Sequence, residues 1–585
     1  MPIETPFLEA SRLVVKAFLN SVVLVDDQAN LGPRMEEPMP TKIVKPGRQG
    51  ATQTEIAAVR RVNPPSAMAE PDALVAVGNE APKTVSVSDS ALMSPAKPSE
   101  RSHSLDAKIV TDVFAQIGVV CAVLRPENAD LEGLGDLVMR VGTNADVLIL
   151  DWVLCDSKLG ERTLDLIKRI VVSAAESGRA QLILIYTAEA DLISIEKNIR
   201  RELKLVEATP RDSLTVSSAG TRICIYGKAG KLGTPIGDSR IKTPKELPAV
   251  VISEFTEMTK GLLSNVAMKS ITAIRAKTFQ LLRRFDCDMD APYVTQSTLI
   301  SPERAEEQLT SLIVSEIQEI LEDENVGSLA DYDYVIRWLD DRMKNGLTLP
   351  ATANMTSEQY YAGLIQLVKD GVGPGAAAKL KQEHAQFAGQ LIPGSKDKAP
   401  VSVRDALTGV LSSYQLSAHQ ADEKLTMLMS LRHRYANPAP QLSLGTVVSR
   451  TDQAGQTYLL CLQPVCDSVR IKSSRPFAFL SLKTAANSKN CELIVNDGDE
   501  LRFLTVKPSP FMVEMISFTS NQNEKVMATN PQNGGFVFNS TDDIVFKWIA
   551  DLKPAHAQRI ANNFAYAFSR VGLVESEWNR LGSKL

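Results

Sequence analysis

The sequence contains no apolar run that approaches the ~20 residues a helix needs to cross a membrane. Its first residues, MPIETPFLEA, lack the basic and apolar blocks of a secretory signal peptide, so we expect a cytoplasmic protein without a membrane partner. Seven cysteines are scattered along the chain, as expected of reduced thiols. Cys461 and Cys466 lie close together, but no second pair of Cys or His lies nearby to complete a zinc site.

The chain also lacks an excess of basic charge. It has 64 Lys and Arg against 69 Asp and Glu, a net charge of −5, which argues against nucleic acid as the main partner. Hydrophobic residues make up 44% and charged residues 23%, proportions typical of a soluble globular protein. A length of 585 residues predicts roughly three to four domains.

Aromatic residues are missing from residues 31–104. This stretch has no Phe, Trp or Tyr, and it holds ten of the chain's 31 prolines. Such a composition buries too little apolar area to offset the entropy of ordering, so we predict a long disordered insertion. The insertion comes shortly after two adjacent acids, Asp26 and Asp27. It would either gate a site at these acids or be a tolerated insertion with no role.

The sequence does contain short apolar runs that each end on a polar residue. Val22–Val25 ends on Asp26 and Asp27, and Val147–Leu150 ends on Asp151. Two further runs, QLILIYT and TRICIYGK, end on Thr187 and Lys228. With a strand at residues 119–126, these runs alternate with helical periods, which predicts a doubly wound, five-stranded parallel sheet.

Carboxylates cannot be buried unpaired, so the acids must lie where their strands end. The carboxyl ends of parallel strands share one edge of a sheet, which is where ligands bind in open α/β folds. We therefore expect an acidic pocket suited to a divalent cation such as Mg²⁺, with one hydroxyl and one ammonium at its margin.

These strand ends resemble the receiver domain of two-component response regulators, a flavodoxin-like fold. The resemblance extends to the aromatic residue after Asp151 and to Ala188 after Thr187. It implies that Asp151 accepts a phosphoryl group from a histidine kinase or phosphotransfer protein. It further implies that Mg²⁺ is held by Asp26, Asp27, Asp151 and the backbone carbonyl of Val153, and that Thr187 and Lys228 contact the phosphate.

The sequence departs from the family at the fifth strand. Ala229 follows Lys228 where the family usually has proline, and Ile225 stands where it tends to have an aromatic switch residue, with Tyr226 one place later. The loop 156–160 also differs from the usual one. A phosphate-independent pseudo-receiver scaffold is therefore an alternative. A haloacid dehalogenase-type phosphatase would need a second Asp two places after Asp26, where Gln28 stands.

The resemblance covers less than half of the chain. We predict a receiver-like domain at residues 1–265, an α-helical domain at 266–437, and a β-rich α+β domain at 438–585 with a terminal helix. Two hairpins are expected, at Asp452–Gly455 and at Asp497 and Gly498. We expect the C-terminal regions to act as an output or partner-binding module in bacterial two-component or phosphorelay signalling, and the resemblance suggests phage defence.

The helix that leaves the receiver-like domain would carry its state onward or form the seam of a homodimer. The dispersed histidines give no second catalytic constellation in residues 266–585. We therefore expect a phosphoryl-accepting signalling protein rather than an enzyme. An unrecognised hydrolase or nuclease at the C-terminus is the remaining alternative.

Overall fold

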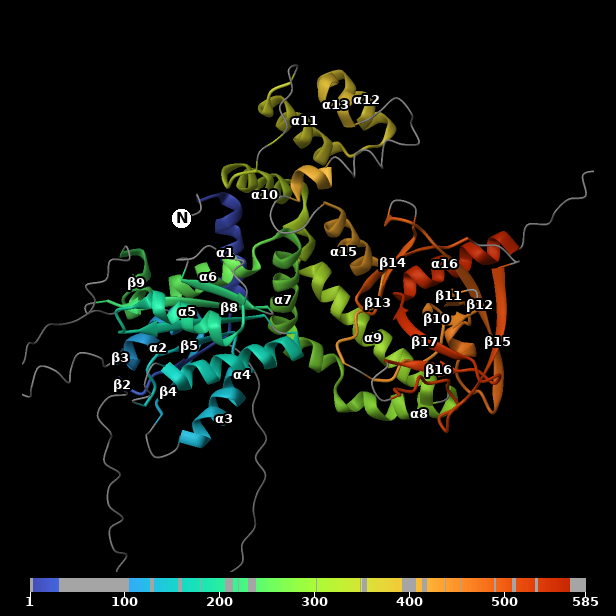
Figure 1. Ribbon diagram of the computed structural model, residues 1–585, viewed down its shortest axis with the longest axis horizontal. Coiled ribbons are helices and arrows are strands. Elements are labelled where there is room, and N and C mark those ends of the chain that lie inside the picture. The colour runs from blue at the N-terminus through green and yellow to red at the C-terminus, as the bar shows by residue number, and fades with distance from the viewer. Residues whose placement is uncertain are drawn as a thin grey trace, which may run out of the picture. The chain divides into compact units, whose positions relative to one another are not determined.

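Figure 1 shows the computed structural model of the chain. It describes residues 4–568 except 31–104, 127–130, 156–159, 179, 206–213, 219, 230–237, 301, 348, 350–354, 392–406, 413–417, 437, 454, 489–490, 508–511 and 532–534. The predicted insertion at residues 31–104 thus lies outside the described residues. The chain forms two compact units, an N-terminal unit, Met1–Asp341, and a C-terminal unit, Arg342–Leu585. This division falls inside the predicted helical domain, and the predicted boundaries at 265 and 437 stay predictions.

The N-terminal unit is built on a seven-stranded sheet in the order β4-β1-β5-β6-β8-β7, with β9 also paired to β8. The predicted five-stranded parallel sheet is confirmed as β4, β1, β5, β6 and β8. Two strands were not predicted: β7 pairs antiparallel with β8, and the short β9 pairs parallel with its end. The strands are β1 (Ser21–Val25), β4 (Val120–Leu124), β5 (Val147–Leu150), β6 (Gln181–Thr187), β7 (Thr215–Ser218), β8 (Thr221–Lys228) and β9 (Ile241–Lys242).

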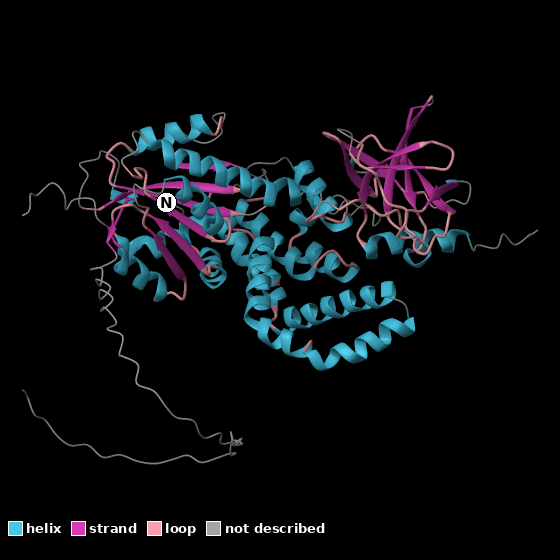
Figure 2. Cartoon of the chain, turned by 90° about the horizontal axis from the view of Figure 1, so that it is seen from below, coloured by secondary structure: helices cyan, strands magenta, loops and turns pink. Residues whose placement is uncertain are grey.

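Helices cover both faces of this sheet (Figure 2). Alternate residues of β1 serve two cores: Val23 and Val25 pack with α3, α4 and α5, while Val22 and Leu24 pack with α1, α2 and α6. A strand buried on both faces must be apolar at every position, which explains the unbroken runs of the sequence. The helices are α1 (Pro6–Phe18), α2 (Ala107–Ala115), α3 (Leu131–Gly142), α4 (Glu161–Ser177), α5 (Leu192–Glu202) and α6 (Leu247–Thr259).

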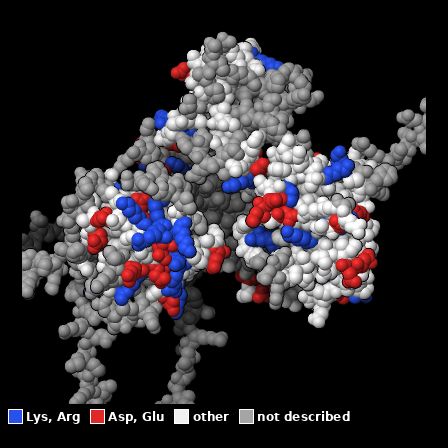
Figure 3. All heavy atoms as spheres, viewed as in Figure 1, with Lys and Arg blue, Asp and Glu red and all other residues white. Residues whose placement is uncertain are grey.

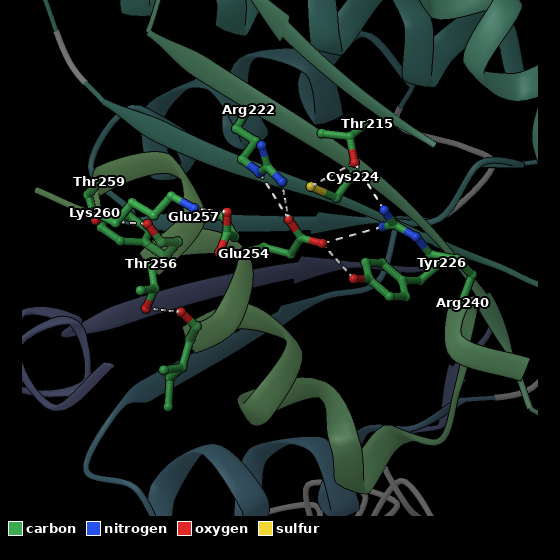
Figure 4. A network of polar contacts seen from close by, with 12 residues as sticks. Thr215, Arg222, Cys224, Tyr226, Arg240, Glu254, Thr256, Glu257, Thr259 and Lys260 are labelled. Carbon is green, nitrogen blue, oxygen red and sulfur yellow. Dashed lines mark hydrogen bonds and ion pairs between the residues drawn. The ribbon is translucent and has the colours of Figure 1, made fainter. Parts of the chain in front are cut away.

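A buried ion-pair network holds α6 against β8 (Figure 4). Glu254 of α6 accepts hydrogen bonds from the Arg222 guanidinium (2.6 and 2.9 Å) and from the Tyr226 hydroxyl (2.6 Å). Arg240, in the short helix η2 (Asp238–Arg240), adds a longer contact of 3.4 Å. Burial alone would raise the pKa of Glu254, but Arg222 and Tyr226 hold it below its ordinary value.

Further helices complete the N-terminal unit. Asn265 of α7 is fully buried and donates to the Ser11 hydroxyl of α1 (2.8 Å) and to the Tyr334 hydroxyl of α10 (3.0 Å). These contacts attach the helical segment to the first helix of the chain. The remaining elements are β2 (Ala29–Asn30), β3 (Leu105–Asp106), η3 (Pro244–Glu246), α7 (Leu262–Arg284), η4 (Cys287–Met289), α8 (Asp290–Ile300), α9 (Pro302–Asp323), η5 (Val326–Ala330) and α10 (Tyr332–Lys344).

The C-terminal unit has helices first and then a β-rich part, as predicted. Its eight-stranded sheet has the order β13-β14-β12-β11-β10-β17-β16, with β15 paired to β12. Both predicted hairpins, β10–β11 and β13–β14, are confirmed. The elements are α11 (Ser357–Asp370), α12 (Pro374–Glu383), α13 (Ala385–Leu391), α15 (Ala418–Ser430), β10 (Thr446–Asp452), β11 (Gly455–Cys461), η7 (Val465–Asp467), β12 (Ser474–Thr484), β13 (Leu493–Asp497), β14 (Glu500–Thr505), β15 (Val513–Thr519), β16 (Val537–Asn539), β17 (Val545–Asp551) and α16 (Pro554–Phe568).

Candidate functional site

Three carboxylates meet at the carboxyl edge of the N-terminal sheet. β1 and β5 are adjacent parallel strands with Val25 opposite Leu150, so the acids that follow them emerge side by side. The backbone continues the ladder here, because the Asp151 amide donates to the Val25 carbonyl (3.0 Å). Carboxylate oxygens of Asp26, Asp27 and Asp151 lie within 4.8 Å of one another. The structure thus brings together the three acids that the sequence predicted.

Lys228 reaches this cluster from the end of β8. Its ammonium lies 2.8 Å from an oxygen of Asp26 and 2.8 Å from an oxygen of Asp151. β6 lies between β5 and β8, and the ammonium crosses its end at 5.8 Å from the centre of the Tyr186 ring. Lys228 is 5% exposed and Asp26 only 2% exposed, so water screens these charges weakly.

One ammonium does not balance three carboxylates. Burial raises the pKa of Asp151, and the neighbouring charge of Asp26 raises it further although Lys228 opposes this. The pKa of Asp27 is raised for the same two reasons, burial and Asp26. Burial would lower the pKa of Lys228, but the charges of Asp151 and Asp26 outweigh it and raise that pKa. The cluster therefore has a surplus of negative charge that a cation would relieve.

Asp27 has one oxygen that hydrogen bonds leave free. Its Oδ2 accepts the Cys155 amide (2.8 Å), whereas its Oδ1 is buried and has no hydrogen-bond partner among the described residues. An orphaned carboxylate oxygen beside two further carboxylates fits a hard divalent cation such as Mg²⁺. Val153, whose carbonyl was predicted to be a ligand, lies in the bend directly after Asp151.

The segment after β5 is held in place by contacts that were not predicted from the sequence. The Trp152 amide donates to the Asp151 carboxylate (2.7 Å), and the Thr163 hydroxyl donates to the carbonyls of both Asp151 and Trp152 (3.0 Å each). Gly160 has φ +70°, and a Cβ there would lie 2.3 Å from the Trp152 ring. Only this glycine could have been found from the sequence, because a change of direction before a helix favours one.

Thr187 and Tyr186 end the neighbouring strand β6. Thr187 is buried at the same edge of the sheet, as predicted, and its hydroxyl accepts the Glu189 amide (3.2 Å). Tyr186 was not singled out from the sequence. Its hydroxyl donates to the Lys242 carbonyl of β9 (2.9 Å), a contact across 56 positions that no local pattern signals.

The departures from the family at β8 have structural explanations. The Ala229 amide donates to the Lys242 carbonyl (2.9 Å), which a proline could not do because it has no N–H. Ile225 is buried in the core with α4 and α5. Tyr226 faces the opposite side, where its hydroxyl is bonded to Glu254. Strand β9 is therefore bonded to the chain directly after β8 through an N–H that the family's usual proline would lack.

Comparison with known proteins agrees with this geometry over the N-terminal unit. The family model described as "Response receiver domain" matches residues 18–232. No curated protein and no solved structure gave a match. No helix among the described residues is long and apolar enough to span a membrane. The strand order, the acidic edge and the family match together identify residues 18–232 as a response receiver domain.

Proposed function

We propose that this receiver domain is a response-regulator-like phosphoacceptor and that Asp151 carries the phosphoryl group. The observation that supports this best is the position of Asp151 between an ammonium and two further carboxylates. A purely structural ion pair would need one acid for Lys228, not three acids at adjoining strand ends. The raised pKa values of Asp27 and Asp151 are typical of a site prepared for a cation and its ligand.

The proposed reaction is a displacement at phosphorus. A carboxylate oxygen of Asp151 forms the new P–O bond while the bond from phosphorus to the donor breaks, and the donor keeps the electron pair. The Trp152 amide and the Thr163 hydroxyl fix the backbone and the carboxylate of Asp151 for this attack. Lys228 would exchange its contact with Asp151 for a phosphate oxygen, and the Thr187 hydroxyl would turn toward the same group.

Mg²⁺ would be held by Asp26, Asp27 and Asp151, with the Val153 carbonyl as a further ligand. When bound, it supplies positive charge that offsets the repulsion between the carboxylates and an incoming phosphate. The buried Oδ1 of Asp27 has no hydrogen-bond partner among the described residues, so a bound ion would relieve the cost of burying it.

A receiver domain implies a histidine kinase or a phosphotransfer protein as the donor. Figure 3 shows Lys and Arg gathered, with acidic side chains among them, over the face that carries α4 and α5. In α5 the exposed basic residues are Lys197 and Arg201. Such a face would attract a donor that carries a phosphoryl group. Residues 266–585 would be the output or partner-binding module, and a role in phage defence stays a prediction from resemblance.

The test is incubation of the full chain with acetyl phosphate and Mg²⁺, read on a phosphate-affinity gel. We expect a shifted band that Asp151→Asn abolishes and that chelation of Mg²⁺ prevents. Asp136→Asn, which changes an exposed acid of α3, is the matched control and should leave the shift unchanged. A wild-type band that stays unshifted while a known receiver is labelled would favour the phosphate-independent scaffold instead.

A further inference from the structure

The helices α7, α8 and α9, here called the helical arm, expose large apolar side chains. Leu263, at the start of α7, is 65% exposed. Six further side chains, two from each helix, are between 50% and 81% exposed: Phe279, Leu282, Val294, Leu299, Leu312 and Val314. None of the residues of α8 is buried. α8 packs against α9, and this packing leaves Val294 and Leu299 exposed.

The arm is also divided by charge. α7 carries five basic residues and no acidic one, whereas α9 carries seven acidic residues and one basic residue. Some of these charges are already paired, since Arg284 lies 3.0 Å from Glu316 of α9 and Lys277 lies 3.0 Å from Glu324, just after α9. Others, such as Arg283 on α7 and Glu306 on α9, are exposed. The arm thus presents a basic helix beside an acidic one.

We propose that the helical arm of a second copy of this chain covers this surface. In a two-fold pairing, the basic α7 of one copy meets the acidic α9 of the other, and the same contact occurs twice. The six apolar side chains would supply about 600 Å² per copy if each buries roughly 100 Å², which is most of the ~800 Å² per partner of a stable interface. A uniformly acidic partner would be repelled by α9, and a uniformly basic partner would be repelled by α7.

The experiment is a dilution series of the unmodified full chain followed by sedimentation velocity. We expect a monomer–dimer equilibrium, with the dissociation constant raised at least about 30-fold by the double change Phe279→Ser and Leu299→Ser. Val172→Ser on α4 is the matched control, because Val172 is an apolar side chain of 51% exposure outside the arm. It should leave the dissociation constant unchanged. No phosphodonor is present, so the result is separate from the test of Asp151.

Charge reversal tests the pairing of α7 with α9 directly. Arg283→Glu and Glu306→Arg should each weaken the homodimer, and an equimolar mixture of the two variants should restore a dimer. A wild-type chain that stays monomeric up to about 100 μM would overturn the proposal, since so weak an association is not specific. It would also be overturned by a dimer that the changes at Phe279 and Leu299 leave intact, or by a monomer in which hydrogen exchange shows the arm already protected by the same chain.

Discussion

Two clusters in this chain each join an aspartate to a lysine, buried in the first and half-buried in the second, and their charges are balanced differently. In the N-terminal unit, Lys228 donates hydrogen bonds to both Asp26 and Asp151, and one oxygen of Asp27 has no hydrogen-bond partner among the described residues. In the C-terminal unit, Asp497 accepts hydrogen bonds from Lys547 (2.6 Å), Tyr458 (2.8 Å) and Gln456.

The pKa directions follow this difference. Burial and Asp26 raise the pKa of Asp27, whereas at Asp497 the donors outweigh burial and lower the pKa. The same residue types therefore fit a ligand site where donors are too few, and they form a structural contact where donors suffice. This distinction rests on the number of donors per carboxylate, not on burial alone.

The largest expected difference between the clusters comes from removing each ammonium. Lys228→Met leaves three carboxylates without a counter-charge, and we expect a loss of about 3–5 kcal/mol in the unfolding free energy of the N-terminal unit. Lys547→Met should cost at most about 1 kcal/mol in the C-terminal unit, because the Lys547 side chain is 43% exposed. Hydrogen exchange in urea, read on peptides from β1 and β17, measures the two units separately. Equal losses would contradict the comparison.

A smaller effect, of opposite sign in the two clusters, is expected from neutralising an acid without metal. Asp27→Asn relieves repulsion by Asp26, so we expect a gain of at most about 1 kcal/mol, limited by solvent screening. Asp497→Asn weakens hydrogen bonds that depend on its charge, so we expect a loss of about 1–2 kcal/mol. The same exchange measurement applies. The measurement is then repeated in Mg²⁺ at about 10 mM, on the order of what saturates weak sites. The stability gain of Asp27→Asn over the wild type should disappear there, because the variant binds the ion less well.

The first cluster could be predicted from the sequence because each of its residues ends or follows an apolar strand. Asp26, Asp27, Asp151, Thr187 and Lys228 stand at positions where a parallel sheet has one shared edge, so topology alone brings them together. The roles given to them, and the carbonyl of Val153 as a ligand, stay predictions.

The elements around the cluster could not be predicted in the same way. Strand β9 has two residues and no periodicity, and its contacts with Tyr186 and Ala229 depend on the chain folding back over a gap of more than ten positions. The cluster at Asp497 was also missed, because its partners lie on two other strands, β11 and β17, and none of them ends an apolar run.

The smallest effect is the dependence on pH, and here again the clusters should differ in sign. A raised pKa means that the folded state binds protons more tightly than the unfolded state, so stability falls as pH rises from the ordinary value of 3.8 through the raised pKa values of Asp27 and Asp151. The lowered pKa of Asp497 gives stability that is present above 3.8 and is lost as pH falls through that lowered value.

Without metal, therefore, raising the pH just above 3.8 should destabilise the N-terminal unit while the C-terminal unit stays at its full stability. Urea titrations between pH 4 and pH 7, on the order of three units above the ordinary value, would show falling stability in peptides from β1 and no trend in peptides from β17. Mg²⁺ should reverse the first trend, because protons compete with the ion for the same oxygens and binding strengthens as they leave. Asp27→Asn should reduce the slope in β1 and leave β17 unchanged, and the slope that remains in β1 belongs to Asp151. A slope in β1 that does not change at all would show that Asp27 does not contribute to it.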